Sequence, residues 1–298
     1  MKLFYFRIFP LFLFCCGIFA KTNFPGLDIY TSVKKLSLGG AGFLQIAPLS
    51  YATNPASYDG KVFSVSLLRY PASITSQSAG IIIPAMDGVF NINIGSTSYG
   101  TFQGYDENAN STNTYSSNDT WIKTAYAKGL FDFPVDYGLS ALYLSSNYNN
   151  NIFGILTFTG GLQINLDSYN AKLGVSLHQF GIQLGDVSAD IKPEIILSFM
   201  KKLTHLPLNL FLDITGNMQS VHNLYLGGIF SLSNKLKLKI GSSNKKIEHN
   251  INKELYKSIM GSTGIGFSYL LKNLSVEYGV FIYGTGSLVQ GIEIGSKF

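Results

Sequence analysis

Charged residues are scarce in this chain of 298 residues. Asp, Glu, Lys and Arg make up 13% of it, about half the fraction usual in a soluble domain. Aromatic residues reach 14% and glycines number 31. A lipid-facing surface explains this composition, because a charge at the middle of a bilayer costs about 2–4 kcal/mol. A soluble all-β domain with a large core is the alternative.

Long apolar runs are also missing. The apolar segment Ile8–Phe19 is interrupted by Pro10 and is shorter than the roughly twenty residues that a transmembrane helix needs. Lys2 and Arg7 precede it, and the small residue Ala20 follows it. A basic start, an apolar centre and a small residue are typical of a secretory signal. We therefore expect residues 1–20 to be a signal peptide and the protein to be exported.

Cysteine occurs only at Cys15 and Cys16, inside that signal. The mature chain would have no disulfide and no thiolate metal site. Lipidation of a cysteine is less favoured, because Phe14 is bulky where lipoprotein processing needs a small residue. Removing Lys2 and Arg7 from the 22 basic residues leaves 20 against 17 acidic ones, a net charge of +3. Such a mild charge implies no nucleic-acid partner.

Apolar and polar residues alternate repeatedly from about residue 62 to the end, whereas no stretch has the period of a long amphipathic helix. In Lys235–Ile240, three lysines share one face and three aliphatic residues the other. The last segment alternates in the same way. Its apolar face holds Leu288, Ile292, Ile294 and Phe298, and its other face holds Gly291, Glu293, Gly295 and Lys297. One face suits lipid and the other suits a polar lumen.

These segments predict an all-β fold, a transmembrane antiparallel β-barrel of about fourteen strands over residues 62–298. Strands are expected near 62–70, 77–84, 88–100, 116–129, 134–147, 151–166, 170–182, 188–202, 206–218, 221–233, 235–245, 258–270, 272–285 and 287–298. The two longest connections, 101–117 and 242–257, follow odd-numbered strands, and short ones follow even-numbered strands. Outer-membrane barrels sort their loops in this way, with the long ones outside the cell.

Residues 21–61 differ in character and are expected to form a plug inside the periplasmic mouth of the barrel. Gly39 and Gly40 belong to a glycine-rich stretch that allows close packing against the wall. Asn54, Pro55 and Ala56 follow. Because Asn is a good helix cap and Pro suits the first helical position, a short helical turn is expected to begin at Asn54.

Three motifs resemble those of the PorV/PorQ family of outer-membrane proteins. The first is Ser37–Gly42 (SLGGAG) followed by Asn54-Pro55-Ala56. The second, Gly100–Asn110 (GTFQGYDENAN), is similar to a loop of the PorQ branch but has Ala109 in place of its glycine. The third, 193–207 (PEIILSFMKKLTHLP), matches that branch except for the position of Glu194 and a serine at 198.

This resemblance implies a FadL-like barrel of fourteen strands and a noncatalytic role in type IX secretion, with the PorQ branch favoured. A member of the family anchors or shuttles surface proteins, so a PorZ-like component or an exported cargo is the expected partner. The residues themselves leave two other interpretations open. One is a FadL-type transporter of hydrophobic small molecules, and the other is an outer-membrane enzyme.

Candidate functional residues are few. No nucleophile and base come together in the sequence, so no catalytic site, cofactor or metal site is predicted. His178, His205, His222 and His249 are scattered, and the Gly261–Gly266 run precedes no helix pattern. The two long loops are the expected partner-binding surface because recognition is commonly placed on exposed loops. The candidate residues in them are Tyr105, Asp106, Glu107, Lys246 and Glu254.

Phe298 ends the last strand on its apolar face, and we predict that it belongs to the signal recognised by the barrel-assembly machinery. Deleting Phe298 should lower the amount of assembled barrel several-fold without affecting export across the inner membrane. The assembled fraction can be measured from the shift in gel mobility between unheated and heated samples. Equal assembled fractions with and without Phe298 would contradict the prediction.

Overall fold

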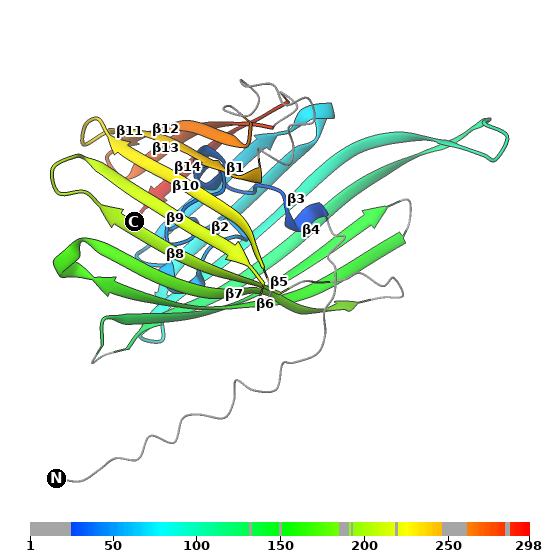
Figure 1. Cartoon of the computed structure of the whole chain (residues 1–298). Coiled ribbons are helices and arrows are strands. Elements are labelled where there is room, and N and C mark those ends of the chain that lie inside the picture. The colour runs from blue at the N-terminus through cyan, green and yellow to red at the C-terminus, as the bar shows by residue number, and fades with distance from the viewer. Residues whose placement is uncertain are drawn as a thin grey trace, which may run out of the picture.

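The structure is a computed structural model that describes residues 25–130, 133–148, 151–184, 191, 193–217, 220–245, 261–283 and 287–298. Fourteen antiparallel strands form one closed barrel in which β14 pairs with β1 (Figure 1). The strands are β1 (Val62–Arg69), β2 (Thr75–Ala85), β3 (Gly88–Tyr105), β4 (Ser111–Gly129), β5 (Val135–Tyr148), β6 (Asn151–Leu166), β7 (Ala171–Leu184), β8 (Glu194–Lys202), β9 (Leu208–Gly216), β10 (Val221–Ser231), β11 (Leu236–Ser243), β12 (Thr263–Leu271), β13 (Leu274–Ile282) and β14 (Leu288–Lys297). The predicted antiparallel barrel of fourteen strands is confirmed.

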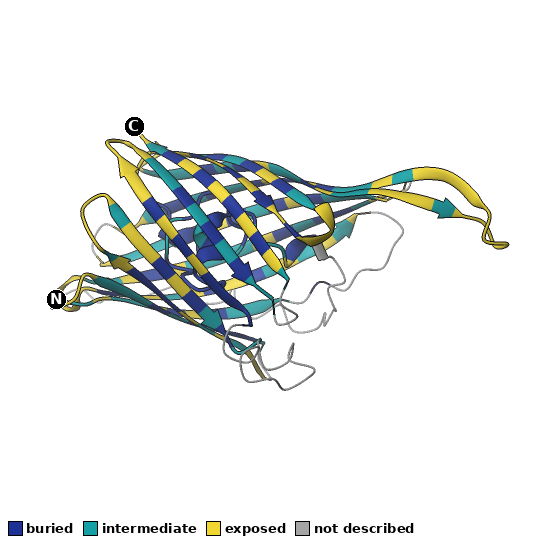
Figure 2. Ribbon diagram, turned by 90° about the horizontal axis from the view of Figure 1, so that it is seen from above, coloured by how far each residue is buried: buried dark blue, intermediate teal, exposed yellow. Residues whose placement is uncertain are grey.

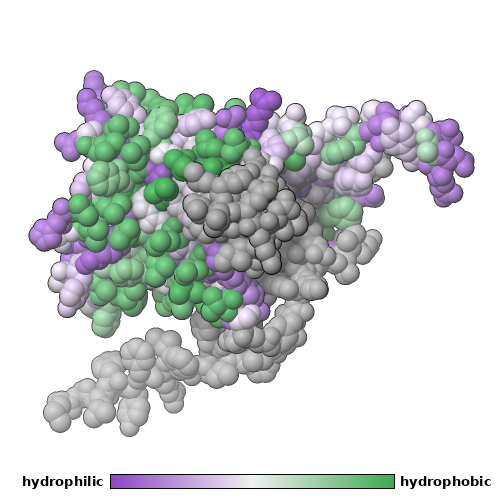
Figure 3. Space-filling model, turned by 45° about the horizontal axis from the view of Figure 1, so that its top comes forward, coloured by the Kyte–Doolittle hydropathy of each residue, from purple (hydrophilic) through white to green (hydrophobic). Residues whose placement is uncertain are grey.

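Burial alternates along the strands, as Figure 2 shows. In β14, Leu288 and Ile292 are exposed on the outer face, whereas Val289, Gly291 and Glu293 are buried inside. The outer face is mostly apolar over the barrel wall, with hydrophilic atoms gathered at its edges (Figure 3). This is the pattern expected where hydrocarbon covers the wall and the interior excludes it.

The two ends of the barrel differ in the length of their connections. At one end, called here the short-loop end, β2–β3, β4–β5, β6–β7, β8–β9, β10–β11 and β12–β13 are joined by two to five residues. The chain enters β1 and leaves β14 at this end. At the other, long-loop end, β11 and β12 are separated by the nineteen residues 244–262. Five connections at this end also have only two to five residues, so the predicted sorting is confirmed only for the longest connection, which follows β11.

The predicted loop over residues 101–117 is wrong, because most of it is strand. β3 continues to Tyr105 and β4 begins at Ser111, leaving only residues 106–110 as a turn. The hairpin continues beyond the last pairing of β3 with β2, at Ser98, and it projects far from the barrel (Figure 1). Its strands contain Thr and aromatic residues, which favour extended structure. The rings of Phe102 and Tyr115 stack across it, 5.5 Å apart.

The N-terminal segment lies inside the barrel rather than only at its periplasmic mouth. It contains two 3₁₀ turns, η1 (Pro25–Leu27) and η2 (Pro55–Ser57), and one short helix, α1 (Val33–Ser37). Two further 3₁₀ turns, η3 (Pro71–Ser73) and η4 (Asp167–Tyr169), join strands. Residues 27–58, called here the plug, are mostly buried. Among the described helices, none is long and apolar enough to cross a bilayer.

Candidate functional site

Glycines of the barrel wall make room for the plug. A Cβ placed on Gly241 would lie 2.0 Å from the carbonyl oxygen of Leu38, and one on Gly264 would lie 2.1 Å from that of Leu36. The same crowding occurs at Gly279 and Gly291, against Ser37 and Val33. Since these glycines lie on β11 to β14, α1 can pack with its backbone directly against that part of the wall.

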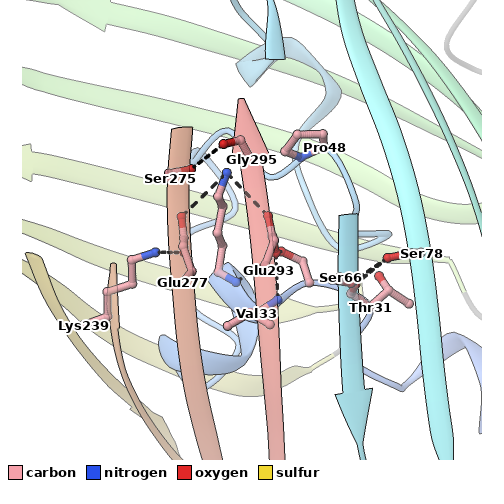
Figure 4. Close-up of polar contacts among 12 residues, drawn as sticks. Thr31, Val33, Pro48, Ser66, Ser78, Lys239, Ser275, Glu277, Glu293 and Gly295 are labelled. Carbon is pink, nitrogen blue, oxygen red and sulfur yellow. Dashed lines mark hydrogen bonds and ion pairs between the residues drawn. The ribbon is translucent and has the colours of Figure 1, made fainter. Parts of the chain in front are cut away.

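Glu293 of β14 holds the start of α1. Its Oε2 accepts hydrogen bonds from the Ser32 hydroxyl at 2.8 Å and from the backbone N–H of Val33 at 2.9 Å (Figure 4). Ser32 is the helix cap, and its hydroxyl accepts from the Lys34 N–H. A carboxylate at a helix N-terminus satisfies backbone donors that have no partner within the helix. The wall therefore fixes both the position and the direction of α1.

A buried ion cluster surrounds this contact. The Lys34 ammonium lies 3.5 Å from Glu293 and 3.9 Å from Glu277 of β13. Glu277 also pairs with Lys239 of β11, one of the three lysines whose alternation predicted a polar lumen. Two carboxylates and two ammonium groups balance, so none of the four charges is buried without a partner of opposite sign.

The glycine-rich motif forms the turn after α1. Gly39, Gly40 and Gly42 have φ values of 60°, 91° and 83°, a region that favours glycine. The turn presents the N–H groups of Gly42 and Phe43 to the buried carboxylate of Asp213 on β9, at 2.6 and 3.4 Å. These glycines therefore have a structural role, because they turn the chain and bring two backbone donors to the wall.

Asn54 of the Asn54-Pro55-Ala56 segment connects the plug to β6 and β7. Its side-chain N–H₂ donates to the carbonyl oxygens of Leu162 at 2.9 Å and Val175 at 3.4 Å. Its Oδ1 accepts from the N–H of Ala56 at 3.0 Å and caps η2, which Pro55 begins. The predicted helical turn at Asn54 is confirmed.

Lys123 of β4 is a third wall anchor, and sequence reasoning missed it. This lysine is 2% exposed. Its ammonium donates to the carbonyl oxygens of Ser50 and Tyr51, at 3.0 and 3.1 Å, and to the Tyr58 hydroxyl at 3.2 Å. No carboxylate of the described residues lies within ion-pair distance of it. In the sequence, the only indication of this role is that Lys123 falls on the inward-facing side of its strand.

Plug carbonyls also accept hydrogen bonds from the first three strands. The Thr31 carbonyl accepts from the hydroxyls of Ser66 and Ser78, at 2.8 and 2.9 Å (Figure 4). The Pro48 carbonyl accepts from the amides of Asn91 and Asn93, at 3.3 and 2.8 Å. The polar residues of the inner wall thus pair largely with the backbone of the plug.

A cavity of about 300 Å³ remains between the plug and the wall. Strands β4 to β8 and β10 line one side of it, and plug residues such as Ile29, Phe43 and Tyr51 line the other. Its lining includes the ammonium-bearing Lys35, Lys123 and Lys245 and the acids Asp28 and Glu194. His178 and His222, which were expected in the lumen or in loops, both line it.

The sides of this cavity differ in chemistry. Lys35 lies over the Phe43 ring, 3.6 Å from its centroid, and donates to the Ala41 carbonyl. His178 packs edge-on to the same ring at 5.8 Å and bonds Ser176. Small hydroxyl-bearing residues, Ser140 and Thr157, face it from β5 and β6. The arrangement can hold a small molecule with an apolar body and a polar group.

None of the three predicted partner-binding residues that the structure describes lines the cavity. Tyr105, Asp106 and Glu107 are exposed at the tip of the β3–β4 hairpin. Hydrogen bonds from Asn110 and Asn108 hold the pKa of Asp106 below its usual value. Lys246 and Glu254 fall outside the described residues. Phe298 is exposed beside the end of β14.

No protein-family model matches this chain, and no curated protein matches it. Two solved structures share the fold. The TodX monoaromatic hydrocarbon channel, as a deltaS2 mutant, is 13% identical with a TM-score of 0.52, over 90% of this chain and 99% of that one. The CymD monoaromatic hydrocarbon channel is 10% identical with a TM-score of 0.56, over 90% and 98%. The PorV/PorQ resemblance stays a prediction.

The contacts of Glu293 predict that Glu293→Ala loosens α1 from the wall. Removing one partner of a buried ion pair costs about 3–5 kcal/mol. Both cysteines lie in the expected signal peptide. A Ser37→Cys substitution therefore gives the mature barrel a single thiol, and the labelling rate of that thiol reports on how accessible α1 is. Its maleimide labelling in the assembled barrel should be slow and should speed up at least tenfold with Glu293→Ala. Glu194→Ala, which removes a carboxylate from the cavity, is the control. Equal labelling rates in all three proteins would contradict the role of Glu293.

Proposed function

We propose that the chain is a noncatalytic outer-membrane channel of FadL type for small, largely apolar molecules. The observation that carries this proposal is the cavity inside the barrel, between plug and wall. An anchor needs no internal cavity, whereas a channel needs a place where its solute can rest. The fold shared with two hydrocarbon channels supports the same choice.

The lining indicates the kind of solute. The rings of Phe43 and Tyr51 offer apolar surface, while Lys35 and Lys123 bring two ammonium groups to the plug side of the cavity. A molecule with one hydrogen-bond acceptor and an apolar body fits both parts of the lining. A strongly hydrophilic solute would leave the aromatic surface unused.

Passage requires movement of the plug. The described plug residues cross the lumen and contact the walls formed by β1 to β3, β6, β7, β9 and β11 to β14. A solute held in the cavity would continue only after some of these contacts open. Conformational gating of this kind sets the rate in many binding proteins.

The channel proposal predicts that filling the cavity blocks uptake. Thr157 is 3% exposed and lines the cavity, so Thr157→Trp should lower the uptake of a labelled monoaromatic hydrocarbon at least fivefold. Leu139→Trp is the matched control, because Leu139 is 65% exposed on the outer face. Uptake is measured in cells that make each variant, and in cells without the protein. Unchanged uptake in Thr157→Trp, with equal barrel levels, would refute the channel.

A surface anchor of type IX secretion is the second candidate, and the projecting β3–β4 hairpin favours it. Residues 99–105 and 111–116 pair only with each other beyond the barrel. Their exposed aromatic residues Phe102 and Tyr105 are of a type enriched in protein interfaces. A PorZ-like component or an exported cargo would be the partner.

This second candidate predicts that the hairpin binds a surface protein. Replacing residues 101–116 with a short Asn-Gly turn should leave the barrel assembled, because the hairpin makes its ladder bonds only with itself. Recovery of cell-surface proteins in a pull-down should fall several-fold. Shortening the β9–β10 connection is the control. Equal recovery of the same proteins by the intact and trimmed barrels would leave the channel as the better account.

A further inference from the structure

The short-loop end of the barrel carries an excess of positive charge. Nine described lysines lie within or next to the last two positions of strands at this end, against four aspartates. The lysines are Lys61, Lys128, Lys172, Lys201, Lys202, Lys235, Lys237, Lys272 and Lys297, and the aspartates are Asp59, Asp87, Asp136 and Asp167. At the long-loop end, the described acids outnumber the described bases. Among the described residues, positive charge is therefore concentrated at the short-loop end.

Aromatic residues on the outer face lie at the same height as these lysines. Tyr126, Phe133, Tyr169, Phe230, Tyr269 and Phe298 all lie near strand ends or turns of the short-loop end. Aromatic girdles mark the level of the lipid headgroups in membrane barrels. Of these lysines, Lys128 and Lys201 lie on the outward-facing side of β4 and β8. Their side chains can extend along the apolar wall and place their charge among the headgroups.

An apolar groove of about 410 Å³ lies on the outer face beside this rim. Strands β5 to β9 line it through outward side chains that include Ile164, Leu173, Leu197 and Phe199. Gly174 and Ser198 also border the groove, and their small size helps to leave it open. The neighbouring outward side chains are aliphatic or aromatic, so an apolar chain fits the groove.

Lys201 connects the groove to the basic rim. It lies two residues beyond Phe199 on the same face of β8, and its ammonium donates to the carbonyl oxygen of Tyr169. Lys172, opposite Met200, and Lys202, at the end of β8, lie on the lumen-facing side of their strands, so Lys201 is the lysine at the end of the groove. An apolar groove that ends beside one outward-facing lysine and an exposed tyrosine has the two-part chemistry of a phospholipid.

We propose that this site binds an anionic phospholipid, with one acyl chain in the groove and the phosphate headgroup at Lys201. The charge excess draws anionic lipid to this leaflet, since basic residues near a membrane surface attract anionic headgroups. The groove then selects one position for it. The site lies on the lipid side of the wall and does not depend on what passes through the lumen.

The test compares lipids and matched substitutions on the mature, assembled barrel. The barrel is purified in detergent with equal amounts of phosphatidylglycerol and phosphatidylcholine of identical acyl chains, and retained lipids are counted by native mass spectrometry. The unmodified barrel should retain at least fivefold more phosphatidylglycerol. Lys201→Gln should abolish this preference. Lys237→Gln, which removes a rim charge from the lumen side of β11, should keep it.

Two further substitutions test the role of the groove. Val175→Trp fills the groove and should reduce the retention of phosphatidylglycerol several-fold, whereas Ile240→Trp, on the outer face of β11, should not. Heat-modified gel mobility shows that each variant is assembled. Equal retention of both lipids by the unmodified barrel would overturn the proposal. Equal losses with Lys201→Gln and Lys237→Gln, or no loss with Val175→Trp, would also overturn it.

Discussion

The closure of the hydrogen-bond ladder between β1 and β14 is the constraint on which the rest of the structure depends. Their pairing runs from Val62 opposite Lys297 to Arg69 opposite Gln290. In hydrocarbon, an unpaired backbone group costs several kcal/mol, so a sheet that meets lipid must leave no open edge. Closure fixes which side chains point inward. It thereby sets the apolar outer face and the polar interior together.

A polar interior of this size needs partners, and the plug supplies them. Strand residues that would otherwise be buried without hydrogen bonds, such as Asp213, Asn93 and Lys123, bond the backbone of residues 42–51. Where the plug carries charge, at Lys34, the wall supplies opposite charge from Glu277 and Glu293. Buried ionic groups of this kind contribute more to a unique position than to net stability.

The sequence predicts the barrel well because strand parity is a local property. Alternation around Lys235–Ile240 and in the last strand indicates correctly which residues face inward. The position of the plug is not predictable in this way, because the contacts of Glu293 with Val33 join residues 260 positions apart. The β3–β4 hairpin was mistaken for a loop because Gly, Asn and Ser interrupt its strands. The sequence shows that glycines such as Gly241 are present. It does not show that they make room for α1, because that depends on where α1 packs.

The plug is not held equally strongly on all sides. Toward β11 to β14 it is fixed by crowded glycine contacts and by an ion cluster in which Lys34, Glu277 and Glu293 are mostly buried. Toward β5 and β6, η2 packs against Gly138 and Gly161, whereas beside Ser140 and Thr157 the plug borders the cavity. Opening on that side exposes a cavity that already exists, while opening on the other side separates buried charges, at a cost of several kcal/mol. In the proposed channel, the plug is therefore expected to keep α1 and η2 in place and to widen the lumen beside Ser140 and Thr157.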